Sequence, residues 1–217
     1  MNLIKEIYEE VISEKYSKGR PLIVVDIQPY YEKYIKKRKG KKFITNFIHF
    51  LNLHRGPINY FFNGDEIGLM DEREELFQWL LEWGLDESVL ERIKFSEKGY
   101  GFFRGLMDSD NEVSRGFIKK LIRYMIINKI QDSREVESEE FLDYKDLIMN
   151  EPIFLPNINI AELKAFENCY ICGGGEHECL SEIRLLLEAF NFKYKILKEL
   201  VSVFINSYIC HLTSKLN

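Results

Sequence analysis

The segment NCYICGGGEHECLSEIRLLLEAF, Asn168–Phe190, carries the pattern that decides the fold. An apolar run at 169–172 meets three consecutive glycines, and apolar residues then recur at helical spacing from Leu180 to Phe190. This pattern predicts a buried strand, a tight turn and a helix that begins near His177. We therefore expect one strand-to-helix unit of an α/β protein here.

Further strand and helix patterns alternate along the chain. Pro21–Ile27, PLIVVDI, is a continuous apolar run rich in β-branched residues, as is typical of a buried parallel strand. Other strand candidates are PINYFF at 57–62, EPIFLP at 151–156 and FKYKILKE at 192–199. Helical patterns occupy 43–53, 71–83, 113–130 and 160–166. The alternation predicts a three-layer α/β/α fold with a mostly parallel central sheet.

The length of 217 residues favours a single α/β domain that spans 1–217. Residues 1–17 have the spacing of an amphipathic N-terminal helix. Residues 201–217 form an apolar C-terminal extension, for which cover of an edge strand and an oligomer interface both stay open. We expect a homo-oligomer.

The net charge of −5 argues against nucleic-acid binding by the whole surface, although it leaves local patches open. The densest such patch is KKRKGKK at 36–42, with six cations in seven residues. A solvated loop and a phosphate or nucleic-acid contact are the two interpretations of that run.

The cysteine pattern favours reduced thiols and a cytoplasmic location. Three of the four cysteines lie within 169–179, and no paired framework spreads along the chain. The N-terminus lacks a continuous apolar core of the signal-peptide kind, and the apolar run at 200–212 is shorter than the roughly 20 residues of a membrane span. We expect no membrane partner.

Cys179 stands out as a candidate nucleophile. It falls in the first turn of the predicted helix, where the helix dipole favours an anion and lowers the pKa of a thiol. The glycines at 173–175 allow backbone N–H groups to point at a ligand above the sheet. A small buried cysteine in a packing turn is the alternative interpretation.

Two further polar residues converge with Cys179 if the strands are parallel neighbours. Asp26 ends the first strand, where open α/β sheets form their sites, although it could equally cap the following helix. Lys98 lies in the middle loop of RIKFSEKGYGFFR, 92–104. A carboxylate can accept the thiol proton, and an ammonium can hold both anions in place.

These motifs resemble the isochorismatase-like cysteine hydrolases, a group that includes the nicotinamidases. VVDIQ at Val24–Gln28 is similar to the first strand of that family, which ends in Asp with Gln two positions later. ICGGGEHEC at Ile171–Cys179 keeps its seven-residue cysteine spacing, and KGYGFF from Lys98 is similar to its lysine segment. The likeness covers most of Pro21–Glu199 and implies an isochorismatase-like, Rossmann-like fold.

The resemblance implies a role for each matching residue. Asp26 would be the base, Lys98 its electrostatic partner and Cys179 the nucleophile. The amides of Gly174 and Gly175 would help form the oxyanion hole, where the family has a cis peptide. The expected substrate-binding residues are Gln28, Asn63, Tyr100, Phe103, Arg104 and His177.

The chain also departs from that family. Asn63–Gly68 contains no histidine, so the metal site of the nicotinamidases is not matched and we expect no metal and no cofactor. Glu176 and Glu178 bring negative charge near the thiol, where the family has a small residue, Thr and Asp. YFFNGDEIG, GYGFFRGLMD, DSRE and the segment at 173–190 also resemble a set in uncharacterised bacteriophage proteins, which implies a phage or prophage origin and a host cytoplasm.

Three functions follow from these patterns. The first is a cysteine hydrolase that acts on a small amide-like or related substrate through Cys179. The second is a catalytically silent module that binds or sequesters a nucleotide-like small ligand with the same pocket. The third is a metal-dependent nuclease that would use carboxylates at the strand ends. Its candidates are Asp26, Asp65, Glu66, Asp108, Asp110 and Asp132.

Overall fold

A computed structural model describes residues 19–64, 73–98, 112–150, 152–156, 158–175 and 179–202, with the backbone alone at 112–114. Its centre is a five-stranded sheet in the order β3-β2-β1-β4-β5, and all paired strands run parallel. The strands are β1 (Leu22–Val25), β2 (Ile58–Asn63), β3 (Ile93–Lys98), β4 (Cys169–Gly173) and β5 (Tyr194–Val201). The predicted three-layer fold with a parallel sheet is confirmed.

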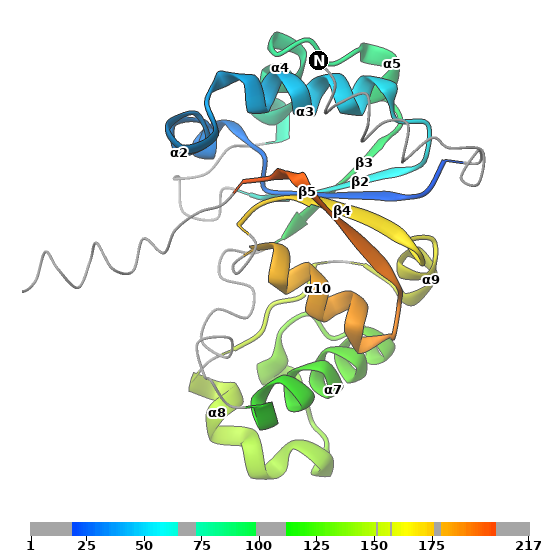
Figure 1. The fold of residues 1–217 in the computed structure, drawn as a ribbon. Helices are drawn as coiled ribbons and strands as arrows, with labels where there is room; N and C mark the ends of the chain where they lie inside the picture. The colour runs from blue at the N-terminus through cyan, green and yellow to red at the C-terminus, as the bar shows by residue number, and fades with distance from the viewer. Residues whose placement is uncertain are drawn as a thin grey trace, which may run out of the picture.

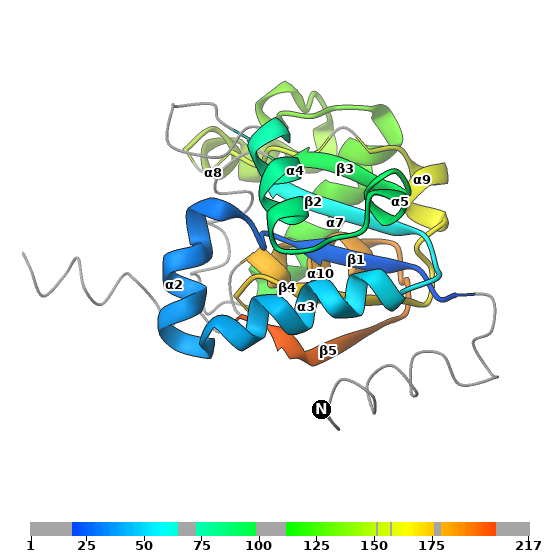
Figure 2. The same cartoon turned by 90° about the horizontal axis from the view of Figure 1, so that it is seen from above.

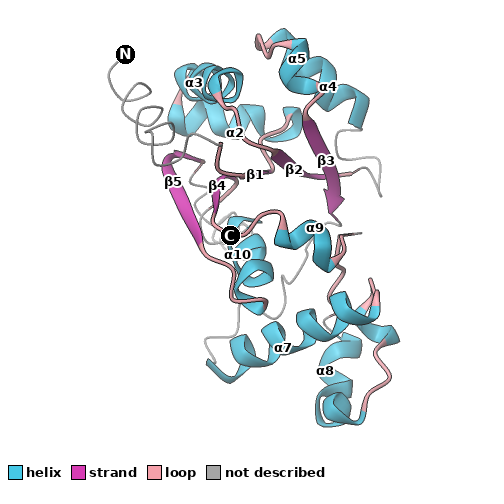
Figure 3. Cartoon of the chain, turned by 90° about the vertical axis from the view of Figure 1, so that its right-hand side faces the viewer, coloured by secondary structure: helices cyan, strands magenta, loops and turns pink. Residues whose placement is uncertain are grey.

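Helices cover both faces of the sheet, as Figures 1 and 3 show. One layer contains α2 (Pro29–Lys39), α3 (Lys41–Leu53), α4 (Arg73–Glu82) and α5 (Glu87–Leu90). The other contains α7 (Glu112–Asn128), α8 (Lys145–Asn150), α9 (Ile160–Lys164) and α10 (Cys179–Ala189), with the short 3-10 turns η2 (Ser133–Glu135) and η3 (Glu139–Tyr144). Seen from above, α3 lies over the β1–β4 side of the sheet, and α4 and α5 lie toward β2 and β3 (Figure 2).

The side chains of β1 divide between the two cores because successive residues of a strand point to opposite faces. Leu22 and Val24 pack with α3 and α4, whereas Ile23 and Val25 pack with α7 and α10. All four are buried, as expected for a strand covered on both sides. The apolar run of Pro21–Ile27 is thus explained by its central place in the sheet.

Several expected elements differ in the structure. EPIFLP forms a single antiparallel bridge between Asp132 and Phe154 rather than a strand. The Leu155 N–H donates to the Gln131 carbonyl, but the Ile153 N–H donates to the Ser133 hydroxyl oxygen instead of a backbone carbonyl, so the pairing does not extend into a ladder. The predicted N-terminal helix at 1–17 lies outside the described residues, as does most of the extension, of which Val201 closes β5 and Ser202 follows it.

The basic run at 36–42 is helical and not a loop. It forms the last turn of α2 and the first turn of α3, with Gly40 between them at a φ of 75°. Lys98 likewise does not lie in a loop, because it is the last residue of β3. That edge strand is buried only at its two end residues, Ile93 and Lys98, and its apolar signal in the sequence is correspondingly weak. Among the described helices, none is both long and apolar enough to cross a lipid bilayer.

Candidate active site

The strand order reverses between β1 and β4. The chain builds β1, β2 and β3 outward in one direction and then returns to add β4 and β5 on the other side of β1. At such a reversal the connections from two neighbouring strands leave in opposite directions, and ligands bind in the opening at their carboxyl ends. Asp26 follows β1, and Cys179 begins α10 after β4.

Asp26 is held in an unusual backbone conformation at this point. Its φ is 49°, in the left-handed region that residues with a side chain seldom adopt, and its side chain is fully buried. Such strain and the burial of a carboxylate both cost free energy, and they persist where surrounding groups hold the residue in place. Gln28, not Asp26, is the N-cap of α2, so Asp26 is a buried and strained residue at the strand end rather than a helix cap.

Lys98 reaches Asp26 across the end of β2. β3 lies two strands from β1, about 10 Å away at the usual strand spacing, so only a long side chain can span the gap. The Lys98 Nζ lies 2.8 Å from Oδ2 of Asp26 and 2.9 Å from Oε2 of Glu182. Burial alone would lower the pKa of Lys98, but the charges of Asp26 and Glu182 raise it well above its ordinary value.

Cys179 completes the predicted group, but its thiol is not acidified. Burial raises the pKa of the Cys179 thiol well above its usual value, and the charge of Asp26 raises it further. Lys98 opposes the shift, while Glu182 and a hydrogen bond with Asp26 add to it. The prediction of a lowered thiol pKa is therefore wrong: the two carboxylates and burial outweigh the helix dipole.

Two glycines let the turn fit against β1. At Gly173 the φ is 107°, and a Cβ there would lie 2.1 Å from the carbonyl oxygen of Val25, so only glycine fits. At Gly174 a Cβ would lie 3.0 Å from the Cβ of Cys179. The missing side chains thus allow Cys179 to approach the end of β1, where Asp26 is placed.

The predicted oxyanion donors differ in their availability. The Gly174 N–H donates to the Val25 carbonyl at 2.6 Å, so it already serves the sheet and cannot receive an oxyanion without breaking that bond. Gly175 is buried, and its carbonyl accepts from the Leu180 N–H at 3.1 Å. Within the described residues no peptide bond is cis, in contrast to what the family resemblance implies.

Gln28 and Asn63 join the ends of β1 and β2. The Gln28 amide donates to the Asn63 carbonyl oxygen at 3.3 Å and accepts from the Asn63 N–H at 3.1 Å. Asn63 in turn donates from Nδ2 to the Tyr31 hydroxyl at 3.1 Å. Both residues border the site, and Gln28 positions the turn that carries Asp26. The other expected substrate contacts, Tyr100, Phe103, Arg104 and His177, lie outside the described residues.

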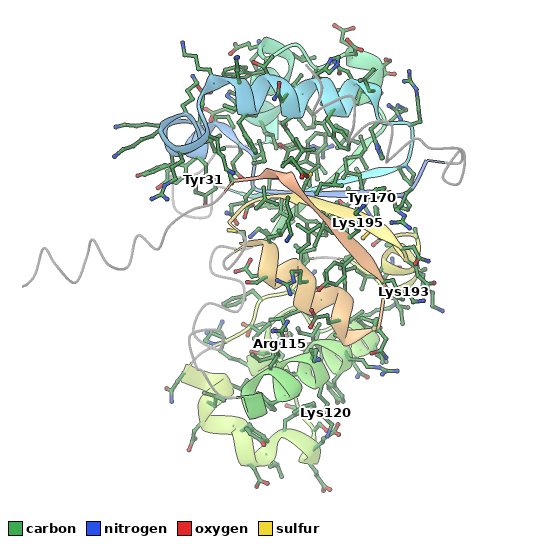
Figure 4. All side chains as sticks on the ribbon, in the orientation of Figure 1. Tyr31, Arg115, Lys120, Tyr170, Lys193 and Lys195 are labelled. Carbon is green, nitrogen blue, oxygen red and sulfur yellow. The ribbon has the colours of Figure 1, made fainter. Side chains whose placement is uncertain are left out.

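Glu182 and Tyr31 belong to this site but escaped the sequence analysis. Glu182 follows Cys179 by three residues on α10, and residues at that spacing share a helix face, so helical periodicity could have identified it. Tyr31 lies on α2, and Figure 4 labels it between that helix and the carboxyl end of the sheet. Burial raises the pKa of Tyr31, and the nearby charges of Asp26 and Cys179 raise it further. No local sequence signal marks Tyr31.

The charges of the site suit a proton transfer between neighbours. With a neutral thiol, Asp26 and Glu182 contribute two negative charges and Lys98 one positive charge, so the cluster carries one net negative charge. Movement of the thiol proton to Asp26 leaves that net charge unchanged while it creates a thiolate. A buried site tolerates such a redistribution better than it tolerates a new charge.

The described residues give no support to a metal centre. No group of three or more ligand-type side chains lies within metal-binding reach in them. Asp26 pairs with Lys98, and Asp132 pairs with Arg134 through Nη2 and Oδ2 at 2.5 Å. The remaining carboxylates of the nuclease hypothesis, Asp65, Glu66, Asp108 and Asp110, lie outside the described residues.

Comparison of the chain with protein-family models, with curated proteins and with solved structures gave no match.

Proposed function

We propose that this protein is a cysteine hydrolase that cleaves a small amide-like substrate through a covalent intermediate on Cys179. The observation that carries the proposal is the convergence of Asp26, Lys98 and Cys179 at the reversal point of the sheet. The three residues come from three separate strand ends, and each has the chemistry that acyl transfer needs. The resemblance to isochorismatase-like hydrolases supports the same assignment of roles.

The reaction begins with a neutral thiol because its pKa is raised. Asp26 accepts the proton from Cys179 Sγ as the sulfur attacks the substrate carbonyl carbon, and a C–S bond forms. Asp26 then returns the proton to the nitrogen as the C–N bond breaks, which releases an amine or ammonia and leaves a thioester. Water attacks the thioester, gives its proton to Asp26 and releases the carboxylic acid, and the thiol regains its proton.

Lys98 holds the arrangement in place during both steps. Its ammonium lies 2.8 Å from Asp26, so it stabilises the carboxylate between proton transfers and the thiolate while that anion exists. Glu182 fixes the other side of the same ammonium at 2.9 Å. The raised Lys98 pKa keeps this charge present throughout the physiological pH range.

The experiment combines a substrate screen with a substrate-free reactivity measurement. The protein is incubated with a panel of small carboxamides and analysed by intact mass for a thioester adduct, which hydroxylamine should release. Cys179→Ala is the matched control and should lack both adduct and turnover. An adduct that persists in Cys179→Ala would contradict the proposal.

Asp26→Asn separates the base from the nucleophile. Because the Asp26 charge raises the thiol pKa, its removal should accelerate alkylation of Cys179 by iodoacetamide at pH 7. The same change should abolish turnover, since asparagine cannot accept the proton. Turnover that survives the substitution would rule out Asp26 as the base.

A silent small-ligand module is the second candidate, and the Glu182 contact favours it. Glu182 occupies a second side of Lys98 and raises the thiol pKa, both of which oppose thiolate formation. This alternative predicts binding without cleavage, unaffected by Cys179→Ser, when the screened compounds are tested by thermal shift. Turnover of any bound compound excludes it.

A further inference from the structure

The outward face of α2 alternates aromatic and basic side chains. Positions 30, 33, 34, 37 and 38 follow the i, i+3, i+4, i+7, i+8 spacing of one helix face. Tyr30 and Tyr34 are 44% and 54% exposed, which is unusual for residues of this size. The basic members of this face, here called the α2 stripe, are also exposed. The full set is Tyr30, Lys33, Tyr34, Lys37 and Arg38.

The inward face of the same helix is used for packing. Ile35 is buried in the core, and Glu32 accepts hydrogen bonds from Trp79 and Trp83 and pairs with Lys36. These contacts fix the rotation of α2, and therefore the direction in which the α2 stripe points. In Figure 4, nitrogen-tipped side chains extend from α2 away from the sheet.

Most cations of this corner have no carboxylate partner among the described residues. Within the described part of the chain, no ion pair involves the six exposed cations of 33–42, namely Lys33, Lys37, Arg38, Lys39, Lys41 and Lys42. The protein as a whole carries a net charge of −5, so this corner has the opposite sign to the rest of the molecule. Such a local field attracts a polyanion.

Stabilisation of a helix by its dipole explains only some of these cations. Cations in the last turn of α2 are favoured by its dipole, whereas Lys41 and Lys42 stand in the first turn of α3, where the dipole disfavours cations. That first turn contains no acidic residue, and Gly40 gives it no side-chain cap. The two lysines therefore stand where the dipole of α3 disfavours a positive charge.

We infer that the α2 stripe, with the adjoining lysines of 39–42, binds single-stranded nucleic acid without sequence preference. The cations contact phosphates, and Tyr30 and Tyr34 stack on exposed bases, which is the combination that single-strand binding surfaces use. A duplex hides its base faces and gives the tyrosines no stacking partner. A membrane-binding helix would present aliphatic residues on this face, and none is exposed on α2.

This inference is independent of the proposed hydrolase, and its test uses a different readout. Fluorescein-labelled dT15 is titrated with the full chain and followed by anisotropy between 50 and 200 mM salt, a range over which phosphate contacts weaken steeply, as a rough guide by tenfold or more. Inorganic polyphosphate supplies the charge without bases, and vesicles with anionic lipid supply it as a membrane. A matched duplex completes the set of probes.

Two variants divide the surface into its parts. Tyr30→Ala/Tyr34→Ala should weaken dT15 binding by about tenfold or more, because each stacked base contributes substantially, and should leave polyphosphate binding within about twofold. Lys33→Gln/Lys37→Gln/Arg38→Gln should weaken both, and it should reduce the salt slope for dT15 by about 2 because three phosphate contacts are lost. Lys145→Gln/Lys164→Gln/Lys193→Gln removes three exposed lysines elsewhere and should change neither.

Circular dichroism of each variant checks that the helices are intact. The inference fails if dT15 binding is absent in the unaltered protein, or if it is unchanged in the tyrosine variant. It also fails if the duplex or the anionic vesicles bind more tightly than dT15.

Discussion

The two ends of the sheet bury ionisable side chains in opposite ways. At the carboxyl end, Asp26, Lys98 and Glu182 are buried together, and the Lys98 Nζ lies 2.8 Å from Asp26 and 2.9 Å from Glu182. At the amino end, His54 is buried after α3 and packs beside Phe50, with a ring separation of 5.7 Å. Burial lowers the pKa of His54 to about 4, and the charge of Arg92 lowers it further.

This difference distinguishes side chains that can take part in a reaction from a side chain that serves packing. The fold keeps charge at the carboxyl end, where neighbours are supplied to balance it, and excludes charge at the amino end, where burial favours the neutral ring. Charged groups that are held in place can exchange protons with a substrate. A neutral imidazole that cannot easily take up a proton serves packing.

Of the substitutions that test this comparison, Lys98→Met should change the free energy of unfolding the most. It leaves two buried carboxylates without their shared cation, and loss of one partner from a buried pair costs about 3 to 5 kcal/mol. Urea unfolding at pH 7 measures the change.

Lys94→Met is the matched control for this measurement. Lys94 lies on the same strand and pairs with Glu162, but its side chain is 45% exposed, and such pairs contribute about 0 to 1 kcal/mol. Equal destabilisation by the two substitutions would contradict the view that the buried ion pairs of Lys98 stabilise the carboxyl end of the sheet.

His54, at the amino end of the sheet, should make the folded protein less stable in acid. The unfolded chain binds a proton at His54 near the ordinary pKa of 6.5, whereas the folded chain binds it only near 4. Stability from this residue is therefore present above pH 6.5 and is lost as the pH falls toward 4, by about 2 to 3 kcal/mol. Unfolding free energies between pH 7.5 and 4.5 measure the loss.

His54→Phe should flatten this part of the pH profile, because phenylalanine does not titrate. His49→Asn is the control, since His49 is exposed on α3 and should leave the profile as it is. If His54→Phe retains the full acid sensitivity, the loss arises from other groups and the contrast between the two ends fails.

Glu182→Gln should have the smallest effect of these substitutions, and the effect is on the reactivity of Cys179. It removes one of the charges that raise the Cys179 pKa, so alkylation by iodoacetamide at pH 8 should become faster. Glu188→Gln, farther along α10 and paired with Arg115, should leave the rate unchanged. A slower reaction in Glu182→Gln would mean that Glu182 acts mainly through the orientation of Lys98.

The sequence predicts the centre of the fold better than its edges. β1 and β4 are covered on both faces and therefore appear as continuous apolar runs, whereas β3 lies at an edge and its pattern is weak. At Phe154 the pairing stops at one bridge because the Ile153 N–H donates to the Ser133 side chain, which an apolar run does not reveal. Local residue pattern therefore predicts a strand most reliably where both faces are buried.

The sequence analysis identified the site residues that lie at or after strand ends, but not the others. Asp26 and Lys98 follow from the rule that the carboxyl ends of parallel strands meet at one edge, together with the family resemblance. The raised thiol pKa did not follow, since it depends on burial and on Glu182, which becomes a neighbour of Lys98 only when α10 packs on the sheet. The charge state of a site is a property of tertiary structure.

The amide of Gln28 has a consequence for how this end of the sheet can change. The hydrogen bonds within the β1–β2 ladder use backbone groups, which all residue types except proline supply. The pair at Gln28, beyond the ladder, uses a side chain, so it depends on the identity of one residue. A single codon change at position 28 can therefore remove this pair, while a change inside β1 to any residue but proline would leave the backbone donors and acceptors in place.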